Sequence, residues 1–227
     1  MTIRIVCATR VSRQEFFAST ALGQSLQVYQ NFLPLELDLY ESNTRGLSEV
    51  FNQSIDRTCD QPVPMMFVHD DVYLNDFYWY DYVLQGLAKF HLIGVAGNRR
   101  RVPGQISWAF VNDQRVWDSS EHLSGVVAHG HGFPSSRLSV YGSSGQPCKL
   151  LDGMLLAANS ETFHTHGIRF DTRFDFHFYD MDLCRQFEMK GLSMGTWSIS
   201  VIHQSEGAIW TPAWHRARAL YQDKYRD

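Results

Sequence analysis

Two adjacent carboxylates, Asp70 and Asp71, follow His69 directly after the apolar run at residues 65–68. Burying two neighbouring negative charges without a partner is costly, so we expect a positive group beside them. Oxygen ligands suit Mg²⁺ or Mn²⁺, and such ions bridge the phosphates of a nucleotide. The pair therefore predicts a divalent cation next to a nucleotide. On the pair alone, a solvated acidic turn after a strand is an equally good interpretation.

A second acidic pair, Asp180 and Asp182, stands where a helical pattern begins. One of these carboxylates, if it points into a cleft, would serve as a general base. Aspartate also caps helices and interacts favourably with the helix dipole in the first turn. A capping role is therefore the alternative for either residue.

Histidines supply a third kind of candidate. His203 ends the apolar run at residues 197–202, and its imidazole is of the type that ligates metals, although a lone histidine is usually structural. His129 and His131, in the sequence AHGHG, have a ligand-like spacing, but no acidic residue or cysteine lies close to them in the sequence. Metal binding is therefore the less favoured interpretation of this pair.

Basic and aromatic side chains in the stretch 99–148 leave two interpretations open. The run Arg99 to Arg101 would clamp a phosphate or an anionic acceptor, or it belongs to a solvated loop. Trp108 and Trp117 would stack on a sugar face, or they pack in the core.

The first hundred residues alternate between strand and helix patterns, which positions the first acidic pair. Strands are expected at residues 3–8, 35–40, 65–68 and 91–97, and helices at residues 12–30, 46–57 and 77–87. This alternation is typical of an α/β fold with a Rossmann-like, mainly parallel sheet flanked by helices. Such sheets bind ligands at the carboxyl ends of their strands, which is where Asp70 and Asp71 lie.

The second half of the chain is expected to be rich in loops. Residues 99–148 contain many Gly, Ser, Pro and His and predict loops with short strands. Beyond them we expect an apolar segment at 150–158 interrupted by Asp152 and Gly153, a helix at 180–190, a strand at 197–202 and a C-terminal helix at 212–225. The last helix has an aromatic stripe that should pack on the same domain, with peripheral membrane contact or a partner protein as the alternative: Trp210, Trp214, Ala217, Tyr221 and Tyr225.

Length and composition favour one soluble domain over residues 1–227. The net charge of −4 argues against a general nucleic-acid binder. The four cysteines form no CxxC pair, which favours a reducing, cytoplasmic compartment. No apolar run approaches the roughly 20 residues of a membrane span.

Five segments follow one another in the order of a known family. They are NTRGLSEVFNQSI (43–55), FVHDDV (67–72), LDGMLL (151–156), FDFHFYDMDLC (174–184) and VIHQS (201–205). With these segments the chain resembles the glycosyltransferase family 2 superfamily with the GT-A fold. More narrowly, it resembles the small branch named for a streptomycin-biosynthesis glycosyltransferase-like protein. The resemblance covers most of the chain apart from the stretch around 99–148.

The resemblance implies a nucleotide pocket and a metal site. Asn43, Gly46 and Asn52 match the segment that builds the nucleotide pocket, and Asp70 in the acidic motif is assigned to the same cofactor-binding set. Asp71 matches the carboxylate that meets the metal. His203 matches the late histidine that completes metal binding in many GT-A enzymes. The implied metal ligands are therefore Asp71 and His203. The chain has His69 where the family's D-x-D motif commonly has its first Asp.

The resemblance also implies the acceptor side of the site. Asp180 falls at the family's catalytic base, with Tyr179 in place of the acidic residue often found before it. Asp152 and Gly153 match a turn near the sugar and the acceptor. Asp182, together with Trp108 from the irregular stretch, is assigned to substrate binding.

The implied activity is transfer of a sugar from a UDP- or GDP-sugar to a hydroxyl of a carbohydrate or other acceptor, with inversion and with Mn²⁺ or Mg²⁺ as cofactor. Residues 1–98 would form the nucleotide-binding half and residues 99–227 the acceptor-binding and catalytic half. One alternative is a sugar nucleotidyltransferase, although TRVSRQEFF, which follows the first strand, lacks the glycines of the usual phosphate loop. The other is a catalytically inactive nucleotide- or sugar-binding protein of the same fold.

Overall fold

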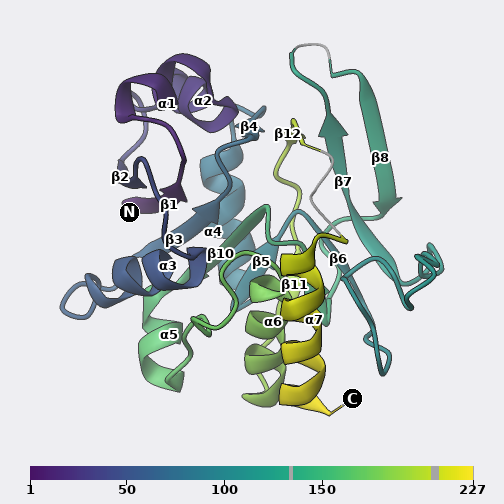
Figure 1. Cartoon of the computed structure of the whole chain (residues 1–227). Coiled ribbons are helices and arrows are strands. Elements are labelled where there is room, and N and C mark those ends of the chain that lie inside the picture. Colours follow the sequence, from purple (N-terminus) through teal and green to yellow (C-terminus); the bar gives the residue numbers. More distant parts are fainter. Residues whose placement is uncertain (133–134, 206–209, 227) are drawn as a thin grey trace.

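The main sheet of the computed structural model is built from the apolar runs of the sequence. The structure describes residues 1–132, 135–205 and 210–226, and within them this sheet has six strands in the order β11-β5-β10-β3-β1-β2. Their bounds are β1 Ile3–Ala8, β2 Leu35–Tyr40, β3 Pro64–Val68, β5 Leu92–Gly94, β10 Leu155–Asn159 and β11 Met194–Thr196. β1 is parallel to β2 and β3, and β11 to β5, whereas β10 is antiparallel to both neighbours. The expected mainly parallel sheet is confirmed (Figure 1).

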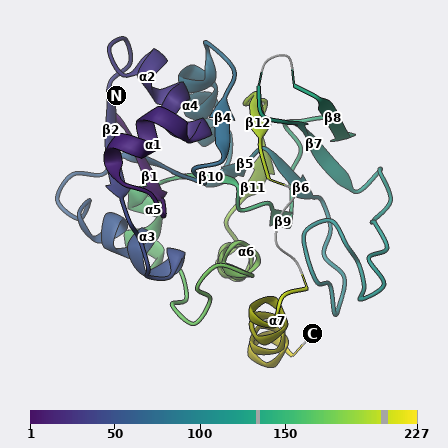
Figure 2. The ribbon, with the colours of Figure 1, turned by 45° about the horizontal axis from the view of Figure 1, so that its top comes forward.

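Helices flank this sheet. Within the described residues they are α1 Arg13–Ser19, α2 Ala21–Tyr29, α3 Leu47–Asp56, α4 Trp79–Lys89, α5 Ser160–His166, α6 Tyr179–Met189 and α7 Pro212–Tyr225. α3 packs on β1 through a buried stripe that includes Val50, Phe51 and Ile55, and α4 packs on β5 and β10. α6 and α7 lie side by side and are seen nearly end-on in Figure 2.

A second, mixed sheet lies beside the first. Its described strands are β4 Val72–Leu74, β6 Ala96–Asn98, β7 Leu123–His129, β8 Arg137–Gly142, β9 Leu150–Leu151 and β12 Val201–His203. They follow the order β4-β12-β7-β6-β9, with β8 paired to β7. β7 and β8 are longer than the short strands expected between residues 99 and 148.

The prediction of one strand over residues 91–97 is wrong. The run divides at Val95, so that β5 belongs to the main sheet and β6 to the second. Both parts are buried, and a continuous apolar run therefore does not reveal a change of sheet. A Cβ atom on Gly97 would lie 2.4 Å from the Leu150 carbonyl oxygen, so the close approach of β6 and β9 requires glycine there.

Two other predicted elements have different bounds, and three short elements were not predicted. The expected helix at 12–30 is two helices, because Thr20 ends α1 and its hydroxyl accepts a hydrogen bond from Gly23 N in α2. The strand expected at 197–202 is confined to Val201–His203. The short elements β4, α5 and β11 were not predicted, because each has too few residues to show a clear period.

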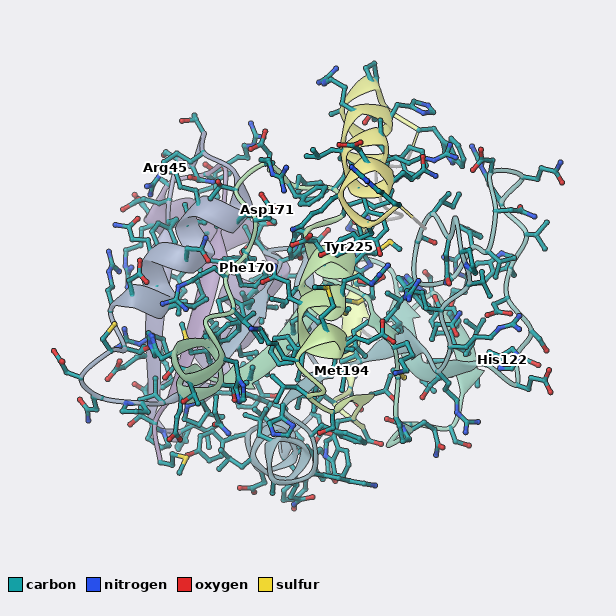
Figure 3. All side chains as sticks on the ribbon, turned by 90° about the horizontal axis from the view of Figure 1, so that it is seen from below. Arg45, His122, Phe170, Asp171, Met194 and Tyr225 are labelled. Carbon is teal, nitrogen blue, oxygen red and sulfur yellow. The ribbon has the colours of Figure 1, made fainter. Side chains whose placement is uncertain are left out.

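The aromatic stripe of α7 packs on the protein itself, as the first of its two interpretations predicted. Trp214 and Tyr221 are buried, and both rings contact Phe178. At the end of α7, Lys224 binds both Asp171 and Asp182. Asp171 and Tyr225 are labelled in Figure 3, near the place where α7 meets α6. No helix among the described residues is both long enough and apolar enough to cross a membrane.

Candidate active-site cleft

A cleft of about 400 Å³ opens where the two sheets meet the first turn of α6. Its polar groups include residues at the end of β3, in the turn between β9 and β10, in the first turn of α6 and around the end of β12. Aromatic side chains from the segment before α6 and from α7 line the rest, among them Phe176, Phe178 and Trp214. The cleft thus lies at the carboxyl end of β3, where the sequence predicted the site.

His69, Asp71 and His203 converge in this cleft. One potential ligand atom from each lies within 4.8 Å of the others, and His203 Nε2 is 3.4 Å from Asp71 Oδ2. Backbone pairing causes this convergence, because His203 in β12 pairs with Val72 in β4 and Gln204 N donates to the Asp71 carbonyl oxygen. The expected approach of Asp71 and His203 across the sequence is therefore seen in the structure.

The carboxylate of this cluster fits a cation. Burial opposes the ionisation of Asp71, but hydrogen bonding to His203 and the nearby imidazoles bring the pKa of Asp71 down to about 2. Burial lowers the pKa of His203, whereas the bond to Asp71 outweighs this and raises it above the ordinary value. Asp71 Oδ1 is buried and has no hydrogen-bond partner among the described residues. An unpaired buried carboxylate oxygen beside two imidazoles is a set of donors that a divalent metal ion would complete.

His69 is a member of this cluster that sequence reasoning missed. Its ring stacks on Phe176 with centroids 5.6 Å apart, and its Nε2 lies 2.8 Å from the Tyr179 hydroxyl. The available signal was its place beside Asp71: residues 69–72 form a turn, with Val72 N donating to the His69 carbonyl oxygen, and His69 and Asp71 both line the cleft. Comparison with the family motif, however, treated His69 only as a residue in the place of the usual aspartate, and not as a candidate ligand.

Asp180 lines the same cleft from the first turn of α6. Its Oδ2 accepts from Gly153 N at 3.0 Å and its Oδ1 from Met181 N at 2.8 Å. Burial, and then the negative charge of Asp152, raise the pKa of Asp180 to about 7, against the opposing effect of the two amides. The N-cap residue of α6 is Phe178, but the bond from Met181 N to Asp180 satisfies an amide of the first helical turn, so a helix-end role for Asp180 stays an alternative.

The turn at Asp152 and Gly153 lines the cleft beside Asp180. Asp152 accepts hydrogen bonds from the indole N–H of Trp108 and from Met154 N. Trp108 is mostly buried and contacts Tyr141 edge-on, so it holds this carboxylate and borders the cleft at the same time.

A second cleft of about 410 Å³ lies on the other side of Phe176, which lines both. It contains Asn43, Gly46 and Asp70, three of the expected nucleotide-pocket residues. The Asp70 carboxylate accepts from the Thr9 hydroxyl at 2.6 Å. The adjacent carboxylates Asp70 and Asp71 therefore line two different clefts, which a linear motif does not show.

Two expected site residues are not brought to either cleft. Both ends of the Asn52 side-chain amide bond the backbone of Phe170, so Asn52 joins α3 to the segment before α6. Asp182 is fully buried and accepts from Lys224, Tyr225 and Gln186. Its place in substrate binding is corrected accordingly: Asp182 anchors α7 to α6.

The other open candidates also have structural partners. Arg100 binds Asp118 and Arg101 binds Glu188, and the run 99–101 is not among the described residues that line the cleft with Asp180. His129 bonds Ser139, whereas His131 lines a separate pocket of about 230 Å³. Trp117 stacks on Tyr141 with centroids 5.9 Å apart. The ligand-like spacing of AHGHG thus does not bring its two histidines to one site.

Comparison with protein-family models gives no match, and comparison with curated proteins gives none either. Among solved structures, GalNAc-T7 with UDP, GalNAc and Mn²⁺ is similar with a TM-score of 0.51 and 12% identity. The match covers 100% of this chain and 50% of that one, so the chain spans half the length of GalNAc-T7. The fold is GT-A-like. Two further structures have lower TM-scores.

The mannosyltransferase PcManGT from Pyrobaculum calidifontis, in complex with GDP-Man and Mn²⁺, has a TM-score of 0.48 and 13% identity, over 99% of this chain and 64% of that one. A197 from STIV has a TM-score of 0.48 and 8% identity, over 93% of this chain and 98% of that one. At 12% identity the likeness to GalNAc-T7 concerns the fold alone, and it confirms the GT-A-like α/β fold that the sequence predicted.

Proposed function

We propose that the chain is a metal-assisted glycosyltransferase that moves a sugar from a UDP- or GDP-sugar to an acceptor hydroxyl with inversion. The observation that carries this proposal is the position of Asp180 in one cleft with the cluster of His69, Asp71 and His203. A base and a cation site on one cleft are the two parts that such a transfer requires.

The two clefts suit the two ends of a donor. The nucleoside would occupy the cleft with Asn43 and Asp70, and the diphosphate would reach the cluster past Phe176, which borders both clefts. A cation held by Asp71 and the two histidines would offset the charge that develops on the departing diphosphate. The GT-A-like protein GalNAc-T7 binds UDP, GalNAc and Mn²⁺, which supports a donor and a cation of these classes.

Asp180 is suited to the role of the base. In the proposed step the acceptor oxygen bonds to the anomeric carbon, the bond from that carbon to the diphosphate breaks, and the acceptor proton passes to Asp180. A base acts best when its pKa is near the working pH, and burial places the pKa of Asp180 at about 7. Asp152, Gly153 and Trp108 would bind the sugar and the acceptor beside it.

A nucleotide- or sugar-binding protein without turnover is the alternative that shares this geometry. A thermal-shift screen of UDP and GDP, each with Mn²⁺ or with a chelator, tests the proposal first, since a ligand of the folded state raises the melting temperature. We expect a larger rise with Mn²⁺ than with chelator. No rise with either nucleotide would contradict the proposal, whereas a rise without sugar transfer would favour the binding protein.

A further inference from the structure

The donor set of the cluster differs from the paired carboxylates of an oxygen-only site. It consists of two imidazoles, from His69 and His203, and one carboxylate, from Asp71. Imidazole nitrogen suits transition metals, whereas Mg²⁺ favours carboxylate, carbonyl and water oxygens. Replacing an oxygen donor by a second nitrogen therefore shifts the preference of a site away from Mg²⁺.

Hydrogen bonding fixes which nitrogen of His69 is free to bind a metal. The Tyr179 hydroxyl lies 2.6 Å from the Gly153 carbonyl oxygen and 2.8 Å from His69 Nε2. A carbonyl oxygen accepts only, so the single hydroxyl proton of Tyr179 goes to Gly153. His69 Nε2 must then carry a hydrogen and donate it to Tyr179, which leaves the lone pair on Nδ1 for a cation.

Neighbouring residues hold the His69 ring and the Tyr179 hydroxyl in this arrangement. Phe176 stacks on one face of the ring. A Cβ atom on residue 153 would lie 2.5 Å from the Tyr179 oxygen, so the approach of Tyr179 to this turn depends on Gly153.

The two positions at which the chain departs from the family motifs, His69 and Tyr179, are thus hydrogen-bonded to each other. We propose that they act together: His69 is a third metal ligand, Tyr179 is the positioning residue that fixes its tautomer, and the cleft prefers Mn²⁺ or Co²⁺ over Mg²⁺. This inference rests on the proposed function only in taking the cluster as the cation site of the donor.

Isothermal titration of the full chain with Mn²⁺, Co²⁺ and Mg²⁺, each with and without UDP or GDP, tests the preference. We expect Co²⁺ and Mn²⁺ to bind at least about tenfold more tightly than Mg²⁺. His69→Asp should reduce this ratio, because it restores an oxygen donor. Tyr179→Phe should weaken Mn²⁺ and Co²⁺ binding by about 10- to 100-fold, which is typical when a group that orients a ligand is removed.

A Co²⁺ absorption spectrum adds a readout that a merely structural role would not change. The visible bands of bound Co²⁺ should differ between the wild type and His69→Asp, since one nitrogen ligand becomes an oxygen. His131→Gln is the matched control, because it removes an exposed histidine of the AHGHG segment in a different pocket; its affinities and bands should equal those of the wild type.

Equal affinity for Mg²⁺ and Mn²⁺, or an unchanged ratio and spectrum in His69→Asp, would overturn the inference. Loss of Co²⁺ binding in His131→Gln would do so as well, because it would assign the metal to AHGHG. Metal-dependent nucleotide binding that does not change in His69→Asp or Tyr179→Phe would reject this inference alone, whereas absence of any metal binding would also reject the metal-assisted function. Circular dichroism of each variant shows that the fold is retained.

Discussion

Asp180→Asn should abolish sugar transfer while stabilising the protein at alkaline pH. Asn cannot take the acceptor proton at neutral pH, and loss of a general base typically costs about 10²- to 10⁴-fold in rate. The effect on stability follows from the pKa, which burial raises from 3.8 to about 7. A raised carboxyl pKa means that the folded state keeps its proton longer than the unfolded state. Stability is therefore lost as the pH rises from about 4 to 7.

The size of this effect can be bounded. The pKa shift corresponds to a destabilisation of the folded state by at most about 4 kcal/mol above pH 7. Residual contact of Asp180 with water and relaxation of the structure make this destabilisation smaller. The side-chain oxygen of Asn can still accept from Gly153 N, but its NH₂ group then faces Met181 N, which is also a donor. Loss of the bond to Met181 N costs about 1–2 kcal/mol of stability. We therefore expect Asp180→Asn to be about 1–3 kcal/mol more stable than the wild type at pH 8, and no more stable at pH 4.5.

Urea denaturation with chelator present, at pH 4.5 and pH 8, measures the stability, and donor turnover at pH 7.5 measures the activity. Asp182→Asn is the matched control from the same helix, since Asp182 bonds Lys224 and Tyr225 instead of lining the cleft. It should lose about 3–5 kcal/mol, as when one partner of a buried ion pair is removed, with activity retained in the folded fraction. Equal destabilisation of Asp180→Asn at both pH values would refute the burial argument, and full turnover would refute its role as base.

Three further predictions follow from single contacts. Gly153→Ala should abolish transfer and lower the melting temperature, because its Cβ would clash with Tyr179 and approach Asp180, whereas Gly132→Ala, with nothing within 4 Å of its Cβ, should do neither. Asp70→Asn should weaken UDP or GDP binding in calorimetry more than it weakens metal binding, because Asp70 lines the other cleft. The bond to Arg100 holds the pKa of Asp118 well below its ordinary value. The pair therefore stabilises the protein above pH 4, and this stabilisation decreases as the pH falls. Asp118→Asn should accordingly lower the melting temperature at pH 7 more than at pH 3.

Periodicity predicted the elements that have long or regular apolar patterns. β1, β2 and α7 occupy the expected residues, and the sheet is mainly parallel as expected. The elements missed or misjudged depend on distant contacts. Val95 lies where one apolar run changes sheet, and Met194–Thr196 becomes a strand only by pairing with Leu92–Gly94. A local pattern does not contain that information.

In the site, too, the sequence predicted which motifs come together but not the direction of every side chain. Asp71, His203, Asp152 and Asp180 line one cleft, as their positions in the motifs implied. Side-chain direction accounts for the errors: Asp182, two residues after Asp180, turns toward α7, and Asn52 turns toward Phe170. The proposed role of His69 as a ligand was not expected, because it depends on a contact with Tyr179, 110 positions away in sequence.

If the cleft breaks the bond between a sugar and a nucleoside diphosphate, the protein should release UDP or GDP from a nucleotide sugar. This release can be measured with a panel of nucleotide sugars, with Mn²⁺ or chelator, for the wild type and for Asp71→Asn. We expect release by the wild type with Mn²⁺ and a loss of at least about 100-fold with chelator or in Asp71→Asn, because the departing charge is then not offset. Nucleotide binding without release from any UDP- or GDP-sugar would contradict this expectation.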